Sequence, residues 1–282
     1  MRLLKMTIKT IFAILGFSGV VLSAGNAMAT PRQLPFTYPY ETLPEGAVEL
    51  EMYGDMTPNR VYADPAGDPT KGRLYEPRYV LQSEFEYGLT DHTELGFYQV
   101  FQAEPKDGGE NALKFDGFKW RVRHRFAEAG QWPVDVAVYV ELETMHDEIS
   151  LEEKLLLSKR FGDLRVMTNL WIEQTIGRPY DAGTKKIDLV VNPTFGVVYE
   201  LTKRFHPGIE YWMRAFLDAS SDDPIDHQNR RAHHFIGPTA HLGLGRLWWT
   251  VGAYVNLSNA NNPQPGEVYG PVWFRSVLGL DL

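Results

Sequence analysis

Apolar and polar residues alternate with a period of two along most of the chain from residue 48 to its end. The most regular stretch is VDVAVYVELE, in which Val134, Val136, Val138, Val140 and Leu142 alternate with Asp135, Ala137, Tyr139, Glu141 and Glu143. Successive side chains of a strand point to opposite faces, so this period predicts strands with one apolar and one polar face. Similar segments recur along the chain, and together they predict twelve strands.

The connections between these segments alternate in length. Every second connection is a short turn: LTDHT, AEAGQ, FGD, LTKRFH and LGLGR. The connections between them are mostly longer, for example residues 55–77, 143–150 and 217–231. Short turns at one end, longer loops at the other and an even number of strands are typical of bacterial outer-membrane barrels. We therefore predict an all-β fold, an antiparallel up-and-down transmembrane β-barrel of about 12 strands.

The first residues have the features of a secretory signal peptide. Arg2, Lys5 and Lys9 precede an apolar run, and Ala27-Met28-Ala29 is a small-x-small cleavage sequence. The apolar run, residues 11–24, is shorter than the ~20 residues of a membrane-spanning helix. We expect three segments: a signal peptide over 1–29, a Pro-rich extended periplasmic lead-in over 30–47 and an outer-membrane barrel over 48–282.

Charge and cysteine content exclude several classes of function. The formal charge of the whole chain is −8, and it becomes −11 when the three cations of the signal peptide are removed. Nucleic-acid binding rests on a net basic surface, so we expect no nucleic-acid partner. The chain has no cysteine, which excludes disulfides, cysteine metal sites and cysteine nucleophiles.

The stretch GFKWRVRHRF, residues 117–126, carries the densest charge. With a period of two, its cations fall on one face and its aromatic and apolar residues on the other. In a membrane barrel the polar face lines the lumen, so we expect these cations to pair with acidic side chains of nearby strands. The predicted lumen charge network is Lys119, Arg121, Arg123, Arg125, Asp135, Glu141, Glu143, Glu84, Glu86, Glu210 and Arg214.

Two interpretations of this network stay open. Paired charges could fill and brace a narrow lumen, and this structural role is the one we favour slightly. Alternatively, separated rows of cations and acids could form a constriction that selects among solutes. The fold by itself supports both interpretations.

Signals for an enzyme or a metal site are weak. The sequence has no G-x-S-x-G, no H-E-x-x-H and no phosphate-binding loop. One acidic stretch, DASSDDPIDHQNRRAHH, could collect a divalent cation in an outer loop through Asp222, Asp223, Asp226 and His227. The spacing follows no known ligand pattern, so we favour a solvated acidic loop. We expect no cofactor.

Two hairpins support a resemblance to a known group of proteins. They are YGLTDHTELGFYQ, residues 87–99, and GVVYELTKRFHPGIEYWMR, residues 196–214. They resemble the repeated turn-and-strand hairpins of uncharacterised proteobacterial outer-membrane barrels, including those of the MetA-pathway phenol-degradation type. The resemblance implies an outer-membrane barrel that passes small molecules, and it implies no catalytic residues.

We therefore expect a protein of the bacterial outer membrane, exported through a cleaved signal peptide. Its expected function is a passive channel for small solutes or a structural barrel with a charge-paired lumen. One alternative is an outer-membrane enzyme that modifies lipids or catalyses hydrolysis, and another is a soluble periplasmic β-sandwich that binds a ligand. The expected partners are outer-membrane lipid, lipopolysaccharide and the barrel-assembly machinery, and small solutes are possible ligands.

Overall fold

The computed structural model describes residues 32–62, 74–103, 113–146, 148–177, 187–218, 232–258 and 270–282. The regular elements of this part of the chain are strands: β1 (Val48–Tyr62), β2 (Leu74–Thr90), β3 (Thr93–Ala103), β4 (Lys114–Arg125), β5 (Asp135–Met145), β6 (Glu148–Phe161), β7 (Leu164–Gly177), β8 (Ile187–Val191), β9 (Thr194–Tyr199), β10 (Phe205–Asp218), β11 (His233–Leu244), β12 (Leu247–Asn256) and β13 (Val272–Asp281). The described residues include no helix with the length and hydropathy needed to cross a bilayer.

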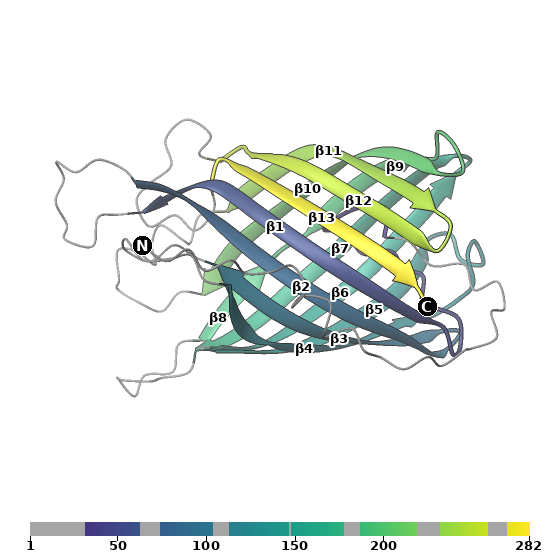
Figure 1. Ribbon diagram of the computed structural model, residues 1–282. Coiled ribbons are helices and arrows are strands. Elements are labelled where there is room, and N and C mark those ends of the chain that lie inside the picture. The colour runs from purple at the N-terminus through teal and green to yellow at the C-terminus, as the bar shows by residue number, and fades with distance from the viewer. Residues whose placement is uncertain are drawn as a thin grey trace, which may run out of the picture.

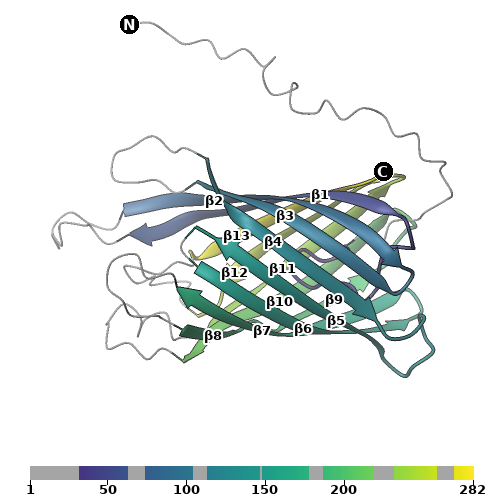
Figure 2. The same cartoon turned by 90° about the horizontal axis from the view of Figure 1, so that it is seen from below.

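The strands form one closed antiparallel barrel. Each strand pairs with the next along the chain except β8 and β9, which both lie between β7 and β10, and β1 pairs with β13 to close the ring. The strands are tilted relative to the barrel axis, as Figures 1 and 2 show. Tilt of this kind accompanies the closure of a sheet into a barrel. The predicted antiparallel barrel is therefore confirmed, and the β-sandwich alternative is wrong because the sheet closes on itself.

The strand count differs from the predicted twelve by one interruption. The predicted strand DLVVNPTFGVVYEL is divided into β8 and β9 at Asn192 and Pro193. Both pieces lie between β7 and β10, with which both form ladders. Proline has no N–H for a ladder, which explains why the pairing stops there. The barrel therefore has twelve strand positions, and β8 and β9 together fill one of them.

The short connections lie at one end of the barrel, which we call the turn end; the opposite end is the far end. The turns after β2, β6 and β11 are as short as predicted, but residues 126–134 between β4 and β5 make a longer connection. Two expected long loops are partly strand. Only residues 146 and 147 separate β5 from β6, and β1 continues through Asp55 to Tyr62.

Apolar side chains cover the outside of the barrel and polar side chains line its lumen. Phe85, Trp120, Val122 and Leu142 are exposed, whereas their strand neighbours Glu84, Glu86, Arg121 and Glu141 are buried. This is the polarity of a membrane barrel and the inverse of a soluble one. The predicted two-faced strands are confirmed in both pairing and direction.

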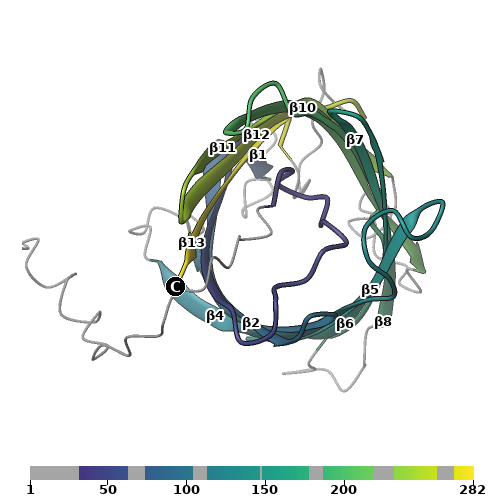
Figure 3. The same cartoon turned by 90° about the vertical axis from the view of Figure 1, so that its right-hand side faces the viewer.

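Residues 32–43, which we call the plug segment, lie inside the barrel. Viewed along the axis, this part of the chain crosses the space within the ring of strands (Figure 3). It enters near the turn end at Gln33, reaches inward to Phe36 and Tyr38, and returns to the turn end at Thr42. The sequence predicts an extended lead-in here, but its position within the lumen is a finding of the structure.

Candidate functional site

The centre of the lumen charge network is the fully buried guanidinium of Arg121 on β4. It contacts three carboxylates: Glu84 at 2.6 Å, Glu94 at 2.5 Å and Glu86. Arg121 lies directly opposite Gly96 on β3, where an added Cβ would come within 2.6 Å of the arginine. Because Gly96 has no side chain, Arg121 reaches across β3 to the acids of β2.

Arg123 extends this cluster toward the turn end. Its guanidinium contacts Glu94 at 2.7 Å and Glu86 at 3.8 Å. Glu94 therefore joins both arginines, and it also accepts a hydrogen bond from the backbone N–H of Leu43 at 2.7 Å. Glu94 is not a member of the predicted network, although the period of two places it on the lumen face of β3 with Gly96 and Tyr98.

Lys119 pairs with the next strand as the sequence suggested. Its ammonium contacts Glu143 at 2.6 Å and Glu141 at 3.2 Å. In the β4–β5 ladder Lys119 lies opposite Glu143 and Arg121 lies opposite Glu141. Arg121 nevertheless binds the acids of β2 and β3 rather than its ladder partner, and the Tyr139 hydroxyl donates to Glu141 at 2.5 Å.

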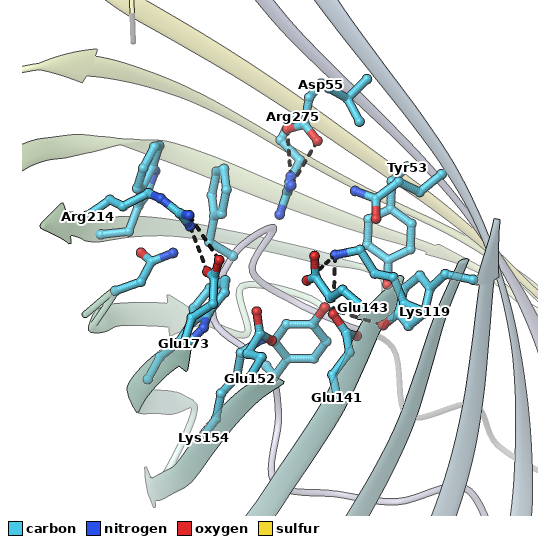
Figure 4. A pocket seen from close by; sticks show the side chains of 18 of the residues that line it. Tyr53, Asp55, Lys119, Glu141, Glu143, Glu152, Lys154, Glu173, Arg214 and Arg275 are labelled. Atoms are coloured by element: carbon cyan, nitrogen blue, oxygen red, sulfur yellow. Dashed lines mark hydrogen bonds and ion pairs between the residues drawn. The ribbon is translucent and has the colours of Figure 1, made fainter. Parts of the chain in front are cut away.

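The other predicted members of the network have different roles. Arg125 pairs with Glu128 at 2.5 Å near the turn end, and Asp135 accepts a hydrogen bond from the backbone of Gly130 at 2.7 Å. Arg214 forms a bidentate pair with Glu173 at 3.0 and 3.1 Å. Figure 4 shows this pair at the wall of a lumen pocket.

Glu210 binds the plug segment. Its carboxylate accepts hydrogen bonds from the backbone N–H groups of Phe36 at 3.0 Å and Thr37 at 2.6 Å, and from the Tyr254 hydroxyl. A segment without secondary structure must satisfy its backbone donors in another way, and buried carboxylates of the wall do so here. The predicted charge at position 210 thus holds backbone rather than a cation.

Further polar contacts bind the plug segment to several strands. Asn169 on β7 both accepts from the Tyr38 N–H at 2.7 Å and donates to the Tyr38 carbonyl at 3.1 Å. On the other side of the lumen, the Thr250 hydroxyl donates to the Arg32 carbonyl at 2.5 Å. The Arg32 guanidinium stacks 3.5 Å above the ring of Tyr38. Contacts to opposite walls hold the segment across the lumen.

Aromatic packing accompanies these hydrogen bonds. Phe36 lies in a buried cluster with Trp212, Phe235, Tyr254 and Trp273. Its ring centroid is 4.5 Å from that of Trp212 and 5.2 Å from that of Tyr254. Such pairs add to the apolar burial. The two-residue period of β10 and β13 places Trp212 and Trp273 on the lumen face, where both are buried.

Between the plug segment and the far end lies a cavity of about 370 Å³. Phe36 and Tyr38 of the plug segment form part of its lining. The surrounding strands contribute further aromatic and polar residues and many charged ones: Asp55, Arg78, Lys119, Glu141, Glu143, Glu148, Glu152, Lys154, Glu173, Arg214 and Arg275. Figure 4 labels most of the charged residues. The cavity has the size of a site for a small solute.

Two groups of carboxylates lie close enough to be considered as metal ligands: Glu51, Glu84 and Glu86, and also Glu141, Glu143 and Glu152. Arg121 contacts Glu84 and Glu86 of the first group, and Lys119 contacts Glu141 and Glu143 of the second. These cations occupy the positions in which a divalent ion would neutralise the acids. The candidate ligands Asp222, Asp223, Asp226 and His227 lie outside the described residues.

At the turn end, the Arg125 guanidinium and its hydrogen bond hold the pKa of Glu128 below the ordinary glutamate value. His92 contributes a second hydrogen bond at 2.9 Å. The side chain of Glu128 is half exposed, so its carboxylate lies in contact with water. Its partner Arg125 is the last of the cations along β4, at the turn end.

No protein-family model matches the sequence, and neither does any curated protein. Solved structures do match. The NanC porin aligns with a TM-score of 0.55 at 9% identity, over 83% of this chain and 100% of that one. What the comparison shows is the fold. It is the β-barrel fold of outer-membrane porins, and the finer resemblance to the MetA-pathway type stays a prediction.

Two further solved structures are similar at lower scores. LpxR from Salmonella typhimurium aligns with a TM-score of 0.43 at 9% identity, over 82% of this chain and 99% of that one. An anion-selective porin from Comamonas acidovorans aligns with a TM-score of 0.36 at 10% identity, over 84% and 99%. At these levels of similarity the matches do not choose between functions.

Proposed function

We propose that this chain is a channel of the bacterial outer membrane that passes small solutes through a charge-lined lumen narrowed by its own plug segment. The exposed apolar face of the strands fits a lipid environment, and this supports the location. The observation that carries the proposal is the cavity on the far side of Phe36 and Tyr38. A barrel braced only by charge would not need a space of that size above its packed centre.

The lumen combines features of both interpretations of the charge network. Arg121 and its acids are fully buried against the plug segment and brace the barrel. Lys119, Arg214 and Arg275 line the cavity instead and would meet an entering solute. Rings of charged side chains are a common means of solute selection in pores. We keep the prediction that the protein is not an enzyme.

The experiment is single-channel conductance of residues 30–282 refolded in detergent and inserted into a planar bilayer. Phe36 and Tyr38 narrow the lumen below the cavity, so F36A and Y38A are expected to raise the conductance. F161A is the matched control because Phe161 is exposed on the outside of the barrel. If the protein and both lumen variants insert into the bilayer but show no conductance, the channel proposal is refuted and the structural role of the barrel is favoured.

A salt gradient across the same bilayer tests the selectivity. The sign of the reversal potential reports whether cations or anions pass more easily. K119Q and R214Q each remove one cavity cation and should shift the reversal potential toward cation preference. The same shift is not expected for R160Q, because Arg160 pairs with Glu200 near the turn end and does not line the cavity.

A further inference from the structure

The ion pairs around the far-side cavity are arranged with their cations toward it. The side chain of Arg214 is 23% exposed and that of its partner Glu173 only 6%. Arg275 is 14% exposed against 4% for Asp55, and Lys119 is 16% exposed against 3% for Glu141 and 11% for Glu143. In these pairs the cation is therefore the member that an entering solute would meet first.

Lys154 differs from these three cations. Its ammonium is enclosed by aromatic rings, 3.7 Å from the ring centroid of Trp171 and 4.1 Å from that of Tyr38. Its side chain is almost fully buried, like that of its partner Glu152. Lys154 is therefore a structural cation, whereas Lys119, Arg214 and Arg275 are the more accessible cations of their ion pairs, on β4, β10 and β13.

Arg275 on β13 has the best-defined geometry of the accessible cations. Its Nε donates to Asp55 Oδ1 at 2.7 Å and its Nη2 donates to Asp55 Oδ2 at 2.8 Å. The Trp273 indole N–H also donates to Asp55 at 2.7 Å, which fixes the carboxylate. Figure 4 shows the guanidinium between Asp55 and the space of the pocket.

One nitrogen of this guanidinium is not used by the protein. Nη1 of Arg275 has no hydrogen bond to any described residue, and arginine presents its donors in a rigid fork. The group lies 3.9 Å above the ring of Phe36. Trp212, which also lines the cavity, has an indole N–H without a partner among the described residues. Two N–H donors, from Arg275 and Trp212, and the aromatic ring of Phe36 therefore lie together at one corner of the cavity.

We propose that this corner binds the carboxylate of small organic anions, with Arg275 as the main contact and Phe36 against the apolar part of the solute. This inference rests on the proposed channel function and names the class of solute. A carboxylate accepts strong, charge-assisted hydrogen bonds from a guanidinium. Asp55 keeps Arg275 oriented and leaves Nη1 for the solute, because its two oxygens occupy only Nε and Nη2.

The test uses butyrate, with butyramide as the neutral probe of the same size. Binding to the detergent-refolded protein is measured by titration calorimetry at low ionic strength. Butyrate is expected to bind and butyramide to bind at least about tenfold more weakly, since hydrogen bonds to charged groups contribute ~1.5–3 kcal/mol. R275Q should weaken butyrate binding about tenfold, and R160Q should leave it unchanged.

The double variant D55N/R275Q removes both members of the pair and leaves no unpaired buried carboxylate. It therefore gives the same comparison if R275Q alone fails to fold. Equal binding of the two probes, or full butyrate affinity in D55N/R275Q, overturns the proposal. Calorimetry does not depend on conduction, so the two proposals can fail separately. A barrel that conducts but does not bind butyrate refutes only the proposed solute class, and a barrel that binds butyrate but does not conduct refutes only the channel function.

Discussion

Arg121 offers the sharpest test of how the lumen is stabilised. Replacing it with methionine keeps an unbranched apolar chain but removes the guanidinium that contacts Glu84, Glu86 and Glu94. The side chains of Arg121, Glu84 and Glu94 are fully buried, so water cannot compensate for the lost charge. Arg123 is then the remaining cation in contact with Glu86 and Glu94.

The expected magnitude follows from this burial. Breaking a buried pair by removing one partner costs ~3–5 kcal/mol, because an uncompensated charge stays in the low-dielectric interior. We expect R121M to lower the free energy of unfolding by that amount. R160M is the matched control: the Arg160–Glu200 pair is largely exposed, and such pairs contribute ~0–1 kcal/mol.

The assay is urea unfolding of the refolded barrel in detergent micelles, followed by tryptophan fluorescence. Adding E86Q to R121M removes one of the unpaired acids and should restore part of the lost stability. The reasoning would be refuted if R121M and R160M unfolded at the same urea concentration. That result would mean that the cluster is hydrated or that its acids take up protons at little cost.

Three further predictions concern the turn end and the plug segment. Arg125 and its hydrogen bond hold the pKa of Glu128 low, so the ionised carboxylate stabilises the fold above the ordinary glutamate pKa, and this contribution is lost as the pH falls through the lowered pKa. R125Q should raise the NMR titration midpoint of Glu128, and an unchanged midpoint would contradict the assignment. E210Q removes one acceptor oxygen from the site that binds the Phe36 and Thr37 N–H groups and should destabilise the bound plug segment by ~1–3 kcal/mol. The measurement is maleimide labelling of a T37C variant, which has no other cysteine, and E210Q should make this labelling faster. A Cβ at Gly196 would come within 2.2 Å of Leu34, so G196V should also speed labelling of T37C. G54V should not, because a Cβ at Gly54 would lie 3.7 Å from Leu81, an ordinary contact distance.

The alternation of side chains was sufficient to predict the wall of the barrel. It identified the strands and the inward direction of the charges. These features depend only on the two-residue period of a strand and on the apolar environment outside. The same period also places Glu94 on the lumen face, but Glu94 directly follows the short turn between β2 and β3 and was not recognised as part of the charge network.

The plug segment could not be predicted in this way because it has no period. Its backbone donors are satisfied by Glu210 and Glu94, which are distant in sequence, and a pattern of residue types does not encode such pairs. Asp55 was missed for a different reason. The Pro and Gly residues that follow it indicate a loop, but the pairing with β13 continues β1 past it.

The plug segment also sets a constraint on assembly. It is the first described part of the chain, whereas its acceptor Glu210 lies 174 residues beyond Phe36. Contacts of such separation form late, because the intervening chain must first be ordered. β1 follows the plug segment directly and completes the ring by pairing with the C-terminal strand. An assembling chain must therefore keep residues 32–43 soluble until β10 is in place, and must enclose them before or as the seam between its two end strands closes.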